Sequence, residues 1–197
     1  MPSEETLMKV IGLTGGIASG KSLVSRFFEI ENVVVLDADK IYKNLLKRDK
    51  IMYNEIKNAF SLTELDLKTL SDIVFNDEEK LKILNSIAHP YVKRAILERI
   101  QRLKKTEKLI VLDIPLLFEA KMENLCDQII CVYAEEKVQL ERLLKRNDLS
   151  LDSALKRINS QMPLKEKCKL SDYVIDNSLD IDNTYRQFKN LFNKIKE

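Results

Sequence analysis

The sequence is poor in glycine. Only four of its 197 residues are glycines, and none follows Gly20. Such a chain has no downstream DxxG switch, no LSGGQ-type signature, no DFG loop and no second GxGxxG fingerprint. The sequence therefore excludes GTPases, ABC-type ATPases, protein kinases and oxidoreductases with two dinucleotide-binding domains. We expect helix ends beyond residue 20 to be capped by Asn, Asp and Ser instead.

Metal-ligating residues and long apolar runs are also scarce. The chain has one histidine, His89, and three cysteines without close metal-ligand spacing: Cys126, Cys131 and Cys168. We therefore expect buried, reduced thiols rather than a zinc site or disulfides. No apolar run approaches the roughly 20 residues of a membrane-spanning helix. The first nine residues lack an apolar signal core, which predicts a cytoplasmic protein.

The charges are nearly balanced. The 33 basic and 31 acidic residues are interspersed and give a net charge of +2. This balance creates no field that would attract nucleic acid or a membrane, so we expect neither as a partner. A length of 197 residues fits a single domain, 1–197, with a sizeable core, as a monomer or a small homo-oligomer.

Five short apolar runs have the length of buried strands. They are continuous rather than alternating, which is typical of a parallel sheet covered on both faces. Helical patterns separate them, so the sequence predicts an α/β fold. The five runs are Lys9 to Thr14, Val33 to Leu36, Leu109 to Leu112, Gln128 to Tyr133 and Tyr173 to Ile175.

Two longer helical stretches interrupt this alternation. Residues 41–107, approximately, form a predicted helical insertion in which one helix starts at Pro90. Residues 136–169, approximately, form a second one that is rich in basic residues. The core then comprises approximately residues 1–40, 108–135 and 170–197. Both insertions follow the carboxyl ends of strands, where open α/β sheets bind ligands.

A phosphate-binding motif follows the first predicted strand. Gly15 to Ser22 reads GGIASGKS and matches GxxxxGK[ST]. The glycines let the backbone curl so that N–H groups point at phosphate oxygens, and the following helix adds its positive end. Lys21 then reaches the β and γ phosphates, and the Ser22 hydroxyl can ligate magnesium.

Three carboxylates follow predicted strands. Asp37 and Asp39 come after the second strand, where a carboxylate can orient an acceptor hydroxyl and take its proton. The alternative for this pair is a helix cap. Asp113 ends the third strand in the manner of a Walker B segment, whose carboxylate holds magnesium. Its alternative is an ordinary polar residue at a strand end.

A helical stripe carries two arginines. Gln139, Arg142 and Arg146 recur at spacings of three and four, opposite a set of leucines. The two arginines can stabilise the charge of a transferring phosphoryl group as parts of a mobile lid. The alternative is a solvated helix face.

Together these segments resemble the dephospho-coenzyme A kinase family. The resemblance rests on the order and spacing of LTGGIASGKS (Leu13 to Ser22), LDAD (Leu36 to Asp39), IVFND (Ile73 to Asp77), HP (His89-Pro90), DIPLLFE (Asp113 to Glu119), QLERLLKR (Gln139 to Arg146), RINSQMP (Arg157 to Pro163) and SDYVIDNS (Ser171 to Ser178). It implies a P-loop kinase-like three-layer α/β fold with a five-stranded parallel sheet, a helical substrate-binding insertion and a helical lid. The implied reaction is ATP-dependent phosphorylation of the ribose 3′-hydroxyl of dephospho-coenzyme A.

The resemblance also implies roles for individual residues. Asp39 would be the catalytic base, assisted by Lys21 and Arg142. The implied ATP-binding residues are Gly15, Gly16, Ala18, Ser19, Gly20, Lys21, Ser22, Leu23, Arg142, Arg146 and Asn177. Acceptor binding falls to Asp39, His89 and Leu117, and Mg²⁺ binding to Ser22 and Asp113. His89 either contacts the acceptor or shapes the helix that follows it.

The chain departs from the family pattern at three places. Leu23 replaces the usual threonine and offers no hydroxyl to the α-phosphate, and Leu67 replaces an arginine. Glu31-Asn32 stands where a glycine is common, so the turn there is built differently.

Two other functions compete with this interpretation. One is a P-loop kinase of another small metabolite or a nucleoside monophosphate. The other is an ATP-binding switch protein without transferase activity, which would have no need of the carboxylates Asp39 and Asp113.

Overall fold

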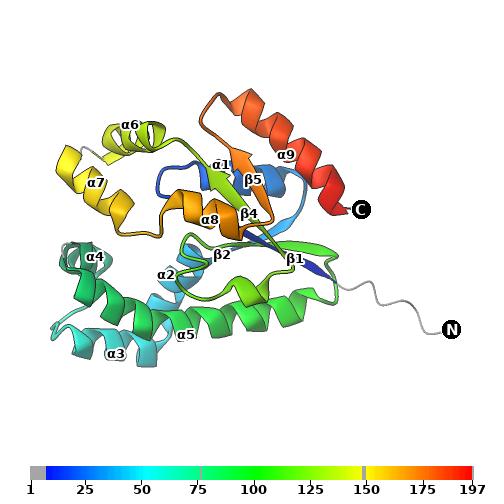
Figure 1. Ribbon diagram of the computed structural model, residues 1–197. Helices are drawn as coiled ribbons and strands as arrows, with labels where there is room; N and C mark the ends of the chain where they lie inside the picture. Colours follow the sequence, from blue (N-terminus) through cyan, green and yellow to red (C-terminus); the bar gives the residue numbers. More distant parts are fainter. Residues whose placement is uncertain (1–7, 76, 148–149, 197) are drawn as a thin grey trace. The chain divides into compact units, whose positions relative to one another are not determined.

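The chain folds around a five-stranded parallel sheet, as predicted. Figure 1 shows the computed structural model, which describes residues 8–75, 77–147 and 150–196. The strand order is β2-β3-β1-β4-β5. The strands are β1 (Lys9–Gly15), β2 (Val34–Asp37), β3 (Leu109–Asp113), β4 (Gln128–Tyr133) and β5 (Tyr173–Asp176). Each predicted strand is confirmed to within one residue at either end.

The residues group into two compact units. The sheet unit contains the residues up to Leu36 and those from Lys104 onward, and the helical unit is Asp37–Leu103. Each unit has its own hydrophobic core. No helix in the described ranges is long and apolar enough to cross a membrane.

One face of the sheet is covered by α1 (Lys21–Ile30) and α9 (Ile181–Lys196). Ile11 and Leu13 of β1 face this side because side chains alternate along a strand. Four phenylalanines join the two helices through ring contacts with centroids 4.9 to 5.7 Å apart: Phe27, Phe28, Phe188 and Phe192. This aromatic packing fixes α1, and with it the segment that leads into α1, on the sheet.

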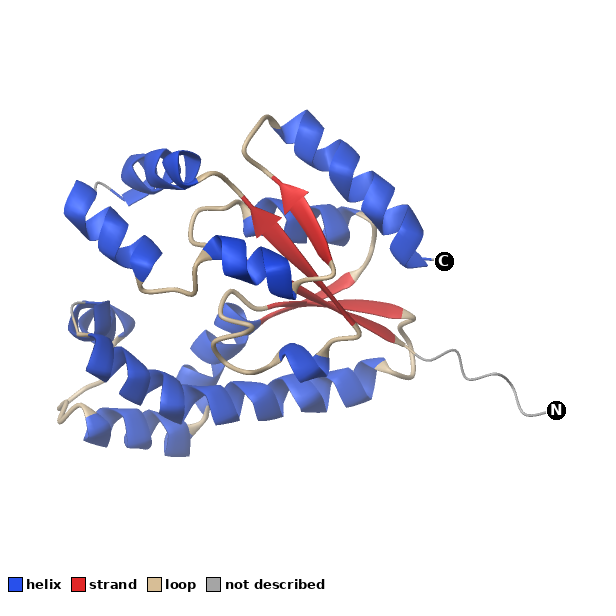
Figure 2. Ribbon diagram, in the orientation of Figure 1, coloured by secondary structure: helices blue, strands red, loops and turns tan. Residues whose placement is uncertain are grey.

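The opposite face is covered by α8 (Leu164–Leu170), so helices lie on both faces (Figure 2). Lys167 of α8 is fully buried, and its Nζ donates to the Pro115 carbonyl and to Glu119 Oε1, each at 2.8 Å. The Sγ atoms of Cys168 in α8 and Cys131 in β4 are 3.6 Å apart, without a disulfide. The burial of these contacts makes α8 part of the sheet unit's core.

The predicted burial of the three thiols is confirmed in full only for Cys131. Cys131 is buried, while Cys126 and Cys168 are half-buried. Burial raises the pKa of Cys126 to about 12, and it also raises the pKa of Cys131. These thiols therefore stay protonated and unreactive at neutral pH.

The rest of the predicted lid region forms two helices that precede α8. These are α6 (Glu136–Asn147) and α7 (Leu151–Asn159). Because α8 packs on the sheet, a moving lid would comprise α6 and α7 rather than all of residues 136–169.

The helical unit consists of α2 (Ala38–Arg48), α3 (Lys50–Ala59), α4 (Leu67–Phe75) and α5 (Glu78–Leu103). The prediction of a helix starting at Pro90 is wrong, because α5 runs through this residue without interruption. Proline removes one backbone hydrogen bond and usually kinks a helix, but the apolar stripe of α5 continues on both sides of it. The buried residues of that stripe are Leu84, Ala88, Val92, Ile96 and Ile100.

Turns after residue 20 are built without glycine. Side chains of Asp37, Asp49 and Ser150 accept backbone hydrogen bonds at the starts of α2, α3 and α7, which confirms the expected capping chemistry. Three turn residues take the left-handed conformation in place of glycine: Asn32 (φ 60°), Ser61 (φ 51°) and Lys121 (φ 52°). Asn32 lies in the Glu31-Asn32 turn before β2, and its left-handed backbone forms this turn without glycine.

Candidate active site

The phosphate-binding motif forms a tight loop between β1 and α1. Two of its residues have left-handed backbones, Ala18 with φ 57° and Gly20 with φ 92°. The Ser19 N–H donates to the Gly16 carbonyl at 3.1 Å, which closes the curl. In this loop Gly20 stands at the N-cap of α1 and no side chain caps the helix, so the first N–H groups of α1 are open to an anion.

Lys21 and Asp113 form an ion pair within the sheet unit. Lys21 Nζ contacts Asp113 Oδ1, and their side chains are 15% and 5% exposed. The pair joins the first residue of α1 to the last residue of β3. The structure therefore brings the predicted phosphate-binding cation and the predicted metal ligand together at the carboxyl edge of the sheet.

Asn177 ties the loop to the segment after β5. Its Nδ2 donates to the Ser19 carbonyl at 2.7 Å, and its Oδ1 accepts from Thr184 Oγ1 at 2.8 Å. Because both ends of this buried amide are engaged, Asn177 holds the shape of the loop. Its predicted contact with ATP stays a prediction.

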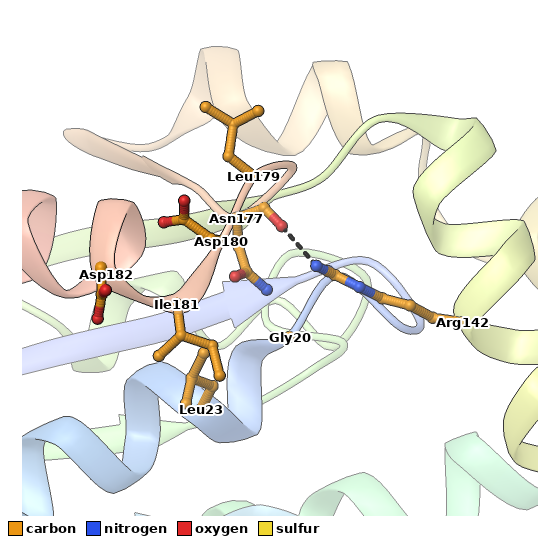
Figure 3. A pocket seen from close by; sticks show the side chains of 8 residues that line it. All are labelled: Gly20, Leu23, Arg142, Asn177, Leu179, Asp180, Ile181 and Asp182. Atoms are coloured by element: carbon orange, nitrogen blue, oxygen red, sulfur yellow. Dashed lines mark hydrogen bonds between the residues drawn. The ribbon is translucent and has the colours of Figure 1, made fainter.

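Arg142 reaches the same place from α6. Its guanidinium donates to the Asn177 carbonyl at 2.8 Å (Figure 3) and to the Ser19 carbonyl at 3.4 Å. The structure thus places one of the two predicted arginines against the phosphate loop. Arg146 also belongs to α6, but its side chain lies outside the described part of the structure.

An open pocket of about 590 Å³ lies beside this cluster (Figure 3). It has a polar side, formed by Gly20, Arg142 and Asn177, and an apolar side. On the apolar side, Leu179 and Ile181 are 67% and 60% exposed. Large exposed apolar side chains beside hydrogen-bonding groups are typical of a ligand pocket. The full lining is Gly20, Leu23, Arg142, Asn177, Leu179, Asp180, Ile181 and Asp182.

Gly15 and Gly16 stand where neighbouring side chains leave no room for a Cβ atom. A Cβ on Gly15 would lie 2.7 Å from Ser19 Oγ, and one on Gly16 would lie 2.7 Å from Gln139 Oε1.

The two side chains that these glycines approach are both buried. Ser19 is fully buried, and its hydroxyl has no hydrogen-bond partner among the described residues. Gln139 is also buried, and its Nε2 donates to the Ala134 carbonyl at 3.0 Å. The Gln139 side chain therefore packs against the loop, as does that of Arg142 on the same stripe.

Gln161 was not predicted as a site residue. Its Oε1 accepts a hydrogen bond from the Ile17 N–H of the phosphate loop at 3.0 Å. The next residue, Met162, donates its N–H to Glu119 Oε1 at 3.0 Å. The connection between α7 and α8 is thereby fastened to the loop. The only signal in the sequence was the RINSQMP segment, which contains Gln161.

The two aspartates after β2 have different roles. Asp37 is the N-cap of α2 and accepts the Lys40 N–H at 2.9 Å. Asp39 lies in the first turn of α2 with an exposed side chain. The capping alternative thus applies to Asp37, and the role of Asp39 as the base stays a prediction.

The remaining predicted residues are placed as follows. Ser22 is exposed in the first turn of α1, and His89 is half-buried within α5. Leu117 is fully buried and would lie 3.2 Å from a Cβ on Gly12. The Leu117 side chain therefore packs in the sheet unit's core, and the predicted substrate contact would require its loop to move.

Comparison with known proteins identifies the family. The dephospho-CoA kinase family model matches residues 9–183. This chain belongs to the dephospho-CoA kinase family. A family member from Carboxydothermus hydrogenoformans is 47% identical over 96% of both chains, and one from Bacillus cereus is 45% identical over 91% of this chain and 94% of the relative.

Solved structures agree with this assignment. The dephospho-CoA kinase from Campylobacter jejuni superposes with a TM-score of 0.70 at 32% identity, over 94% of this chain and 96% of that one. A Thermus thermophilus structure gives a TM-score of 0.80 at 31% identity, over 95% and 98% of the two chains. A shikimate kinase from Bacteroides thetaiotaomicron, with a TM-score of 0.51 and 15% identity over 96% and 99% of the chains, shares the fold alone.

Proposed function

We propose that this protein transfers the γ-phosphoryl group of ATP to the ribose 3′-hydroxyl of dephospho-CoA, which yields CoA and ADP. The observation that carries the proposal is a complete phosphate loop in a chain of the dephospho-CoA kinase family, with Lys21 beside Asp113 and Arg142 against the loop. ATP and dephospho-CoA are then its small-molecule partners, and the cytoplasm its compartment.

ATP occupies the sheet unit in this proposal. Its phosphates lie on the uncapped N-terminus of α1, where the helix dipole and open N–H groups favour negative charge. Lys21 exchanges its contact with Asp113 for the β and γ phosphates. The adenine occupies the pocket lined by Leu23, Asn177 and Ile181.

The residues at the loop fit Mg²⁺. Ser22 offers an exposed hydroxyl and Asp113 a carboxylate, the hard oxygen ligands that Mg²⁺ prefers. Mg²⁺ is commonly bound by one or two protein oxygen ligands together with substrate phosphates and water. When bound, Mg²⁺ neutralises the charge that develops on the transferring phosphoryl group.

Asp39 acts as the base in this proposal. It orients the 3′-hydroxyl and takes its proton as the oxygen attacks the γ-phosphorus. Arg142, with Arg146 from the same helix, stabilises the charge on the transferring group. His89 and Leu117 stay predicted contacts of the acceptor.

The activity is tested by incubating the pure protein with ATP, Mg²⁺ and dephospho-CoA. We expect ADP and CoA in equal amounts, and none above background for Lys21→Ala. Absence of turnover by the unmodified protein would overturn the proposal.

A thermal-shift panel tests which class of acceptor the protein binds. Dephospho-CoA should raise Tm, whereas CMP, AMP and shikimate should not.

Replacement of the proposed base tests the mechanism. We expect Asp39→Asn to lower kcat by about 100-fold or more, because the amide cannot accept the proton, while ATP affinity stays unchanged. Asp37→Asn is the matched control, since asparagine also caps helices and should retain most of kcat. Near-normal kcat for Asp39→Asn would exclude Asp39 as the base.

A further inference from the structure

A fully buried lysine lies in the sheet unit, outside the residues assigned to the reaction. Lys167 of α8 has no exposed surface, and its Nζ donates to the Pro115 carbonyl and to Glu119 Oε1, each at 2.8 Å. A buried ion pair adds little net stability, because the attraction between its charges is offset by their desolvation. Apolar side chains of similar volume often stabilise such a position as well. The pair therefore points to a role in placing other groups.

The ammonium group of Lys167 is fixed relative to two strands. The Pro115 carbonyl that it contacts also accepts Thr14 Oγ1 at 3.0 Å. Thr14 is fully buried in β1 and directly precedes the phosphate loop, while Pro115 follows the last residue of β3 by two positions. These are the strands that lead to the loop and to Asp113, so Lys167 Nζ is anchored at the carboxyl edge of the sheet.

Glu119 joins this anchored ammonium group to the connection between α7 and α8. Its Oε1 accepts both Lys167 Nζ and the Met162 N–H, the latter at 3.0 Å. Its Oε2 is buried and has no hydrogen-bond partner among the described residues. Because the carboxylate is held through one oxygen, its orientation depends on Lys167.

The residue before Met162 reaches the phosphate loop. Gln161 Oε1 accepts the Ile17 N–H at 3.0 Å, and Ile17 lies between Gly16 and the left-handed Ala18, where the loop backbone turns. Met162 and Gln161 share a planar peptide unit, so a shift of the Met162 N–H also moves Gln161. A short series of hydrogen bonds thus leads from the buried ion pair to the backbone of the loop.

We propose that Lys167 and Glu119 are positioning residues for nucleotide binding. The pair fixes the connection between α7 and α8, so that Gln161 holds the phosphate loop in the shape that accepts ATP. Neither residue of the pair contacts the nucleotide. This inference deepens the proposed function and rests on its ATP-binding step alone.

Replacement of the buried lysine by methionine, which has a similar length and no charge, tests the role of the pair. We expect Lys167→Met to raise the Kd for ATP about fivefold, the effect of losing roughly one hydrogen bond. In turnover assays KM for ATP should rise by the same factor, with a smaller effect on kcat and none on KM for dephospho-CoA. An unchanged Kd for ATP, measured by calorimetric titration, would overturn the proposal.

The matched control is an ion pair of the same unit that has no route to the loop. Lys189 of α9 pairs with Glu31, the C-cap residue of α1, at 2.7 Å. We expect Lys189→Met to lower Tm and to leave the Kd for ATP unchanged. An equal rise of the Kd in both variants would assign Lys167 a general stabilising role and contradict the proposal.

Combination with Gln161→Ala separates positioning from packing. If Lys167 acts through Gln161, the effects of the two replacements are not additive. We expect Lys167→Met/Gln161→Ala to raise the Kd for ATP about fivefold, like either single replacement, rather than by the roughly 25-fold of independent effects. Poorer packing of α8 alone would add to the effect of Gln161→Ala, so additive effects would exclude the route through Gln161.

A second variant covers the case in which Lys167→Met does not fold, because it leaves Glu119 as a buried carboxylate without its cation. Lys167→Met/Glu119→Gln removes both charges and should also raise the Kd for ATP about fivefold. An unchanged Kd in this variant would equally overturn the proposal. If the unmodified protein binds ATP without phosphorylating dephospho-CoA, the proposed function fails and the titrations still decide the positioning role. If it phosphorylates dephospho-CoA and the variants bind ATP normally, only the positioning role fails.

Discussion

Gly20 is the residue whose replacement we expect the site to tolerate least. Its backbone has φ 92°, and a Cβ there would overlap Nδ2 of Asn177. Gly20→Ala therefore strains the loop and displaces the amide that holds Ser19. We expect ATP affinity to fall at least 100-fold, measured by calorimetric titration.

Ala18 offers the matched control for Gly20. It also has a left-handed backbone, with φ 57°, but it already carries a side chain. Ala18→Gly relieves this conformation and should keep ATP affinity within a few-fold of the original. If Gly20→Ala bound ATP as well as Ala18→Gly does, backbone conformation would not control nucleotide binding.

Tyr42 carries a hydroxyl that the fold does not use. This hydroxyl is buried without a hydrogen-bond partner among the described residues, and burial raises its pKa to about 12. Its removal in Tyr42→Phe abolishes a desolvation cost, so we expect the free energy of unfolding to stay unchanged or to rise by up to about 1 kcal/mol. Urea denaturation of both proteins measures this change in the free energy of unfolding. A loss of more than about 1 kcal/mol would show that the hydroxyl has a stabilising partner.

At the level of single residues, sequence reasoning found the groups within local motifs and missed the contacts between residues far apart in the sequence. The phosphate loop and Asp113 were predicted because a strand, a glycine pattern and a terminal acid lie within short segments. The hydrogen bond from Asn177 to Ser19 joins residues 158 positions apart, and no spacing rule reports it. Leu117 fits a family motif, yet only the packing shows that its side chain is buried.

Among the secondary-structure elements, the connection between α7 and α8 has the clearest functional consequence. Gln161 in this connection accepts the Ile17 N–H of the phosphate loop. Gln161→Ala removes one hydrogen bond, which contributes about 1 kcal/mol, so we expect KM for ATP to rise about fivefold with a smaller effect on kcat.

Gln187→Ala is the control for this element. Gln187 also bridges backbone groups, since its side chain bonds the N–H and the carbonyl of Asp176 at 2.9 and 2.8 Å. We expect this variant to lower Tm without changing KM for ATP. Equal KM values for the two variants would assign Gln161 a purely structural role.

The strands were predictable from sequence because buried parallel strands are short, continuous and apolar. The helices of the insertion were harder to predict from the sequence. Proline at position 90 normally marks a helix start, but the apolar stripe of α5 holds the helix together on both sides of it. The lid was predicted over residues 136–169, which include most of α8, whereas Lys167 of α8 is buried by contacts with Glu119 and the Pro115 carbonyl.

On the scale of the whole molecule, each of the two units has its own core. Because a ligand stabilises the residues that it contacts, ATP and dephospho-CoA should protect different units. We expect amide hydrogen exchange to slow at residues 16–23 with ATP, and in α2 and α3 with dephospho-CoA. CMP is the control and should protect neither. Unchanged exchange in α2 and α3 with dephospho-CoA would contradict acceptor binding there.

The left-handed turns at Asn32, Ser61 and Lys121 affect the denatured state as well as the folded one. A chain nearly free of glycine samples fewer backbone conformations when unfolded, so it loses less entropy when it folds. Each left-handed turn without glycine, in contrast, stores about 1 kcal/mol of strain in the folded chain. The lower conformational entropy of the unfolded chain thus offsets the strain at these turns. Ser61→Gly or Lys121→Gly would relieve the strain in the folded chain and would also raise the entropy of the unfolded chain.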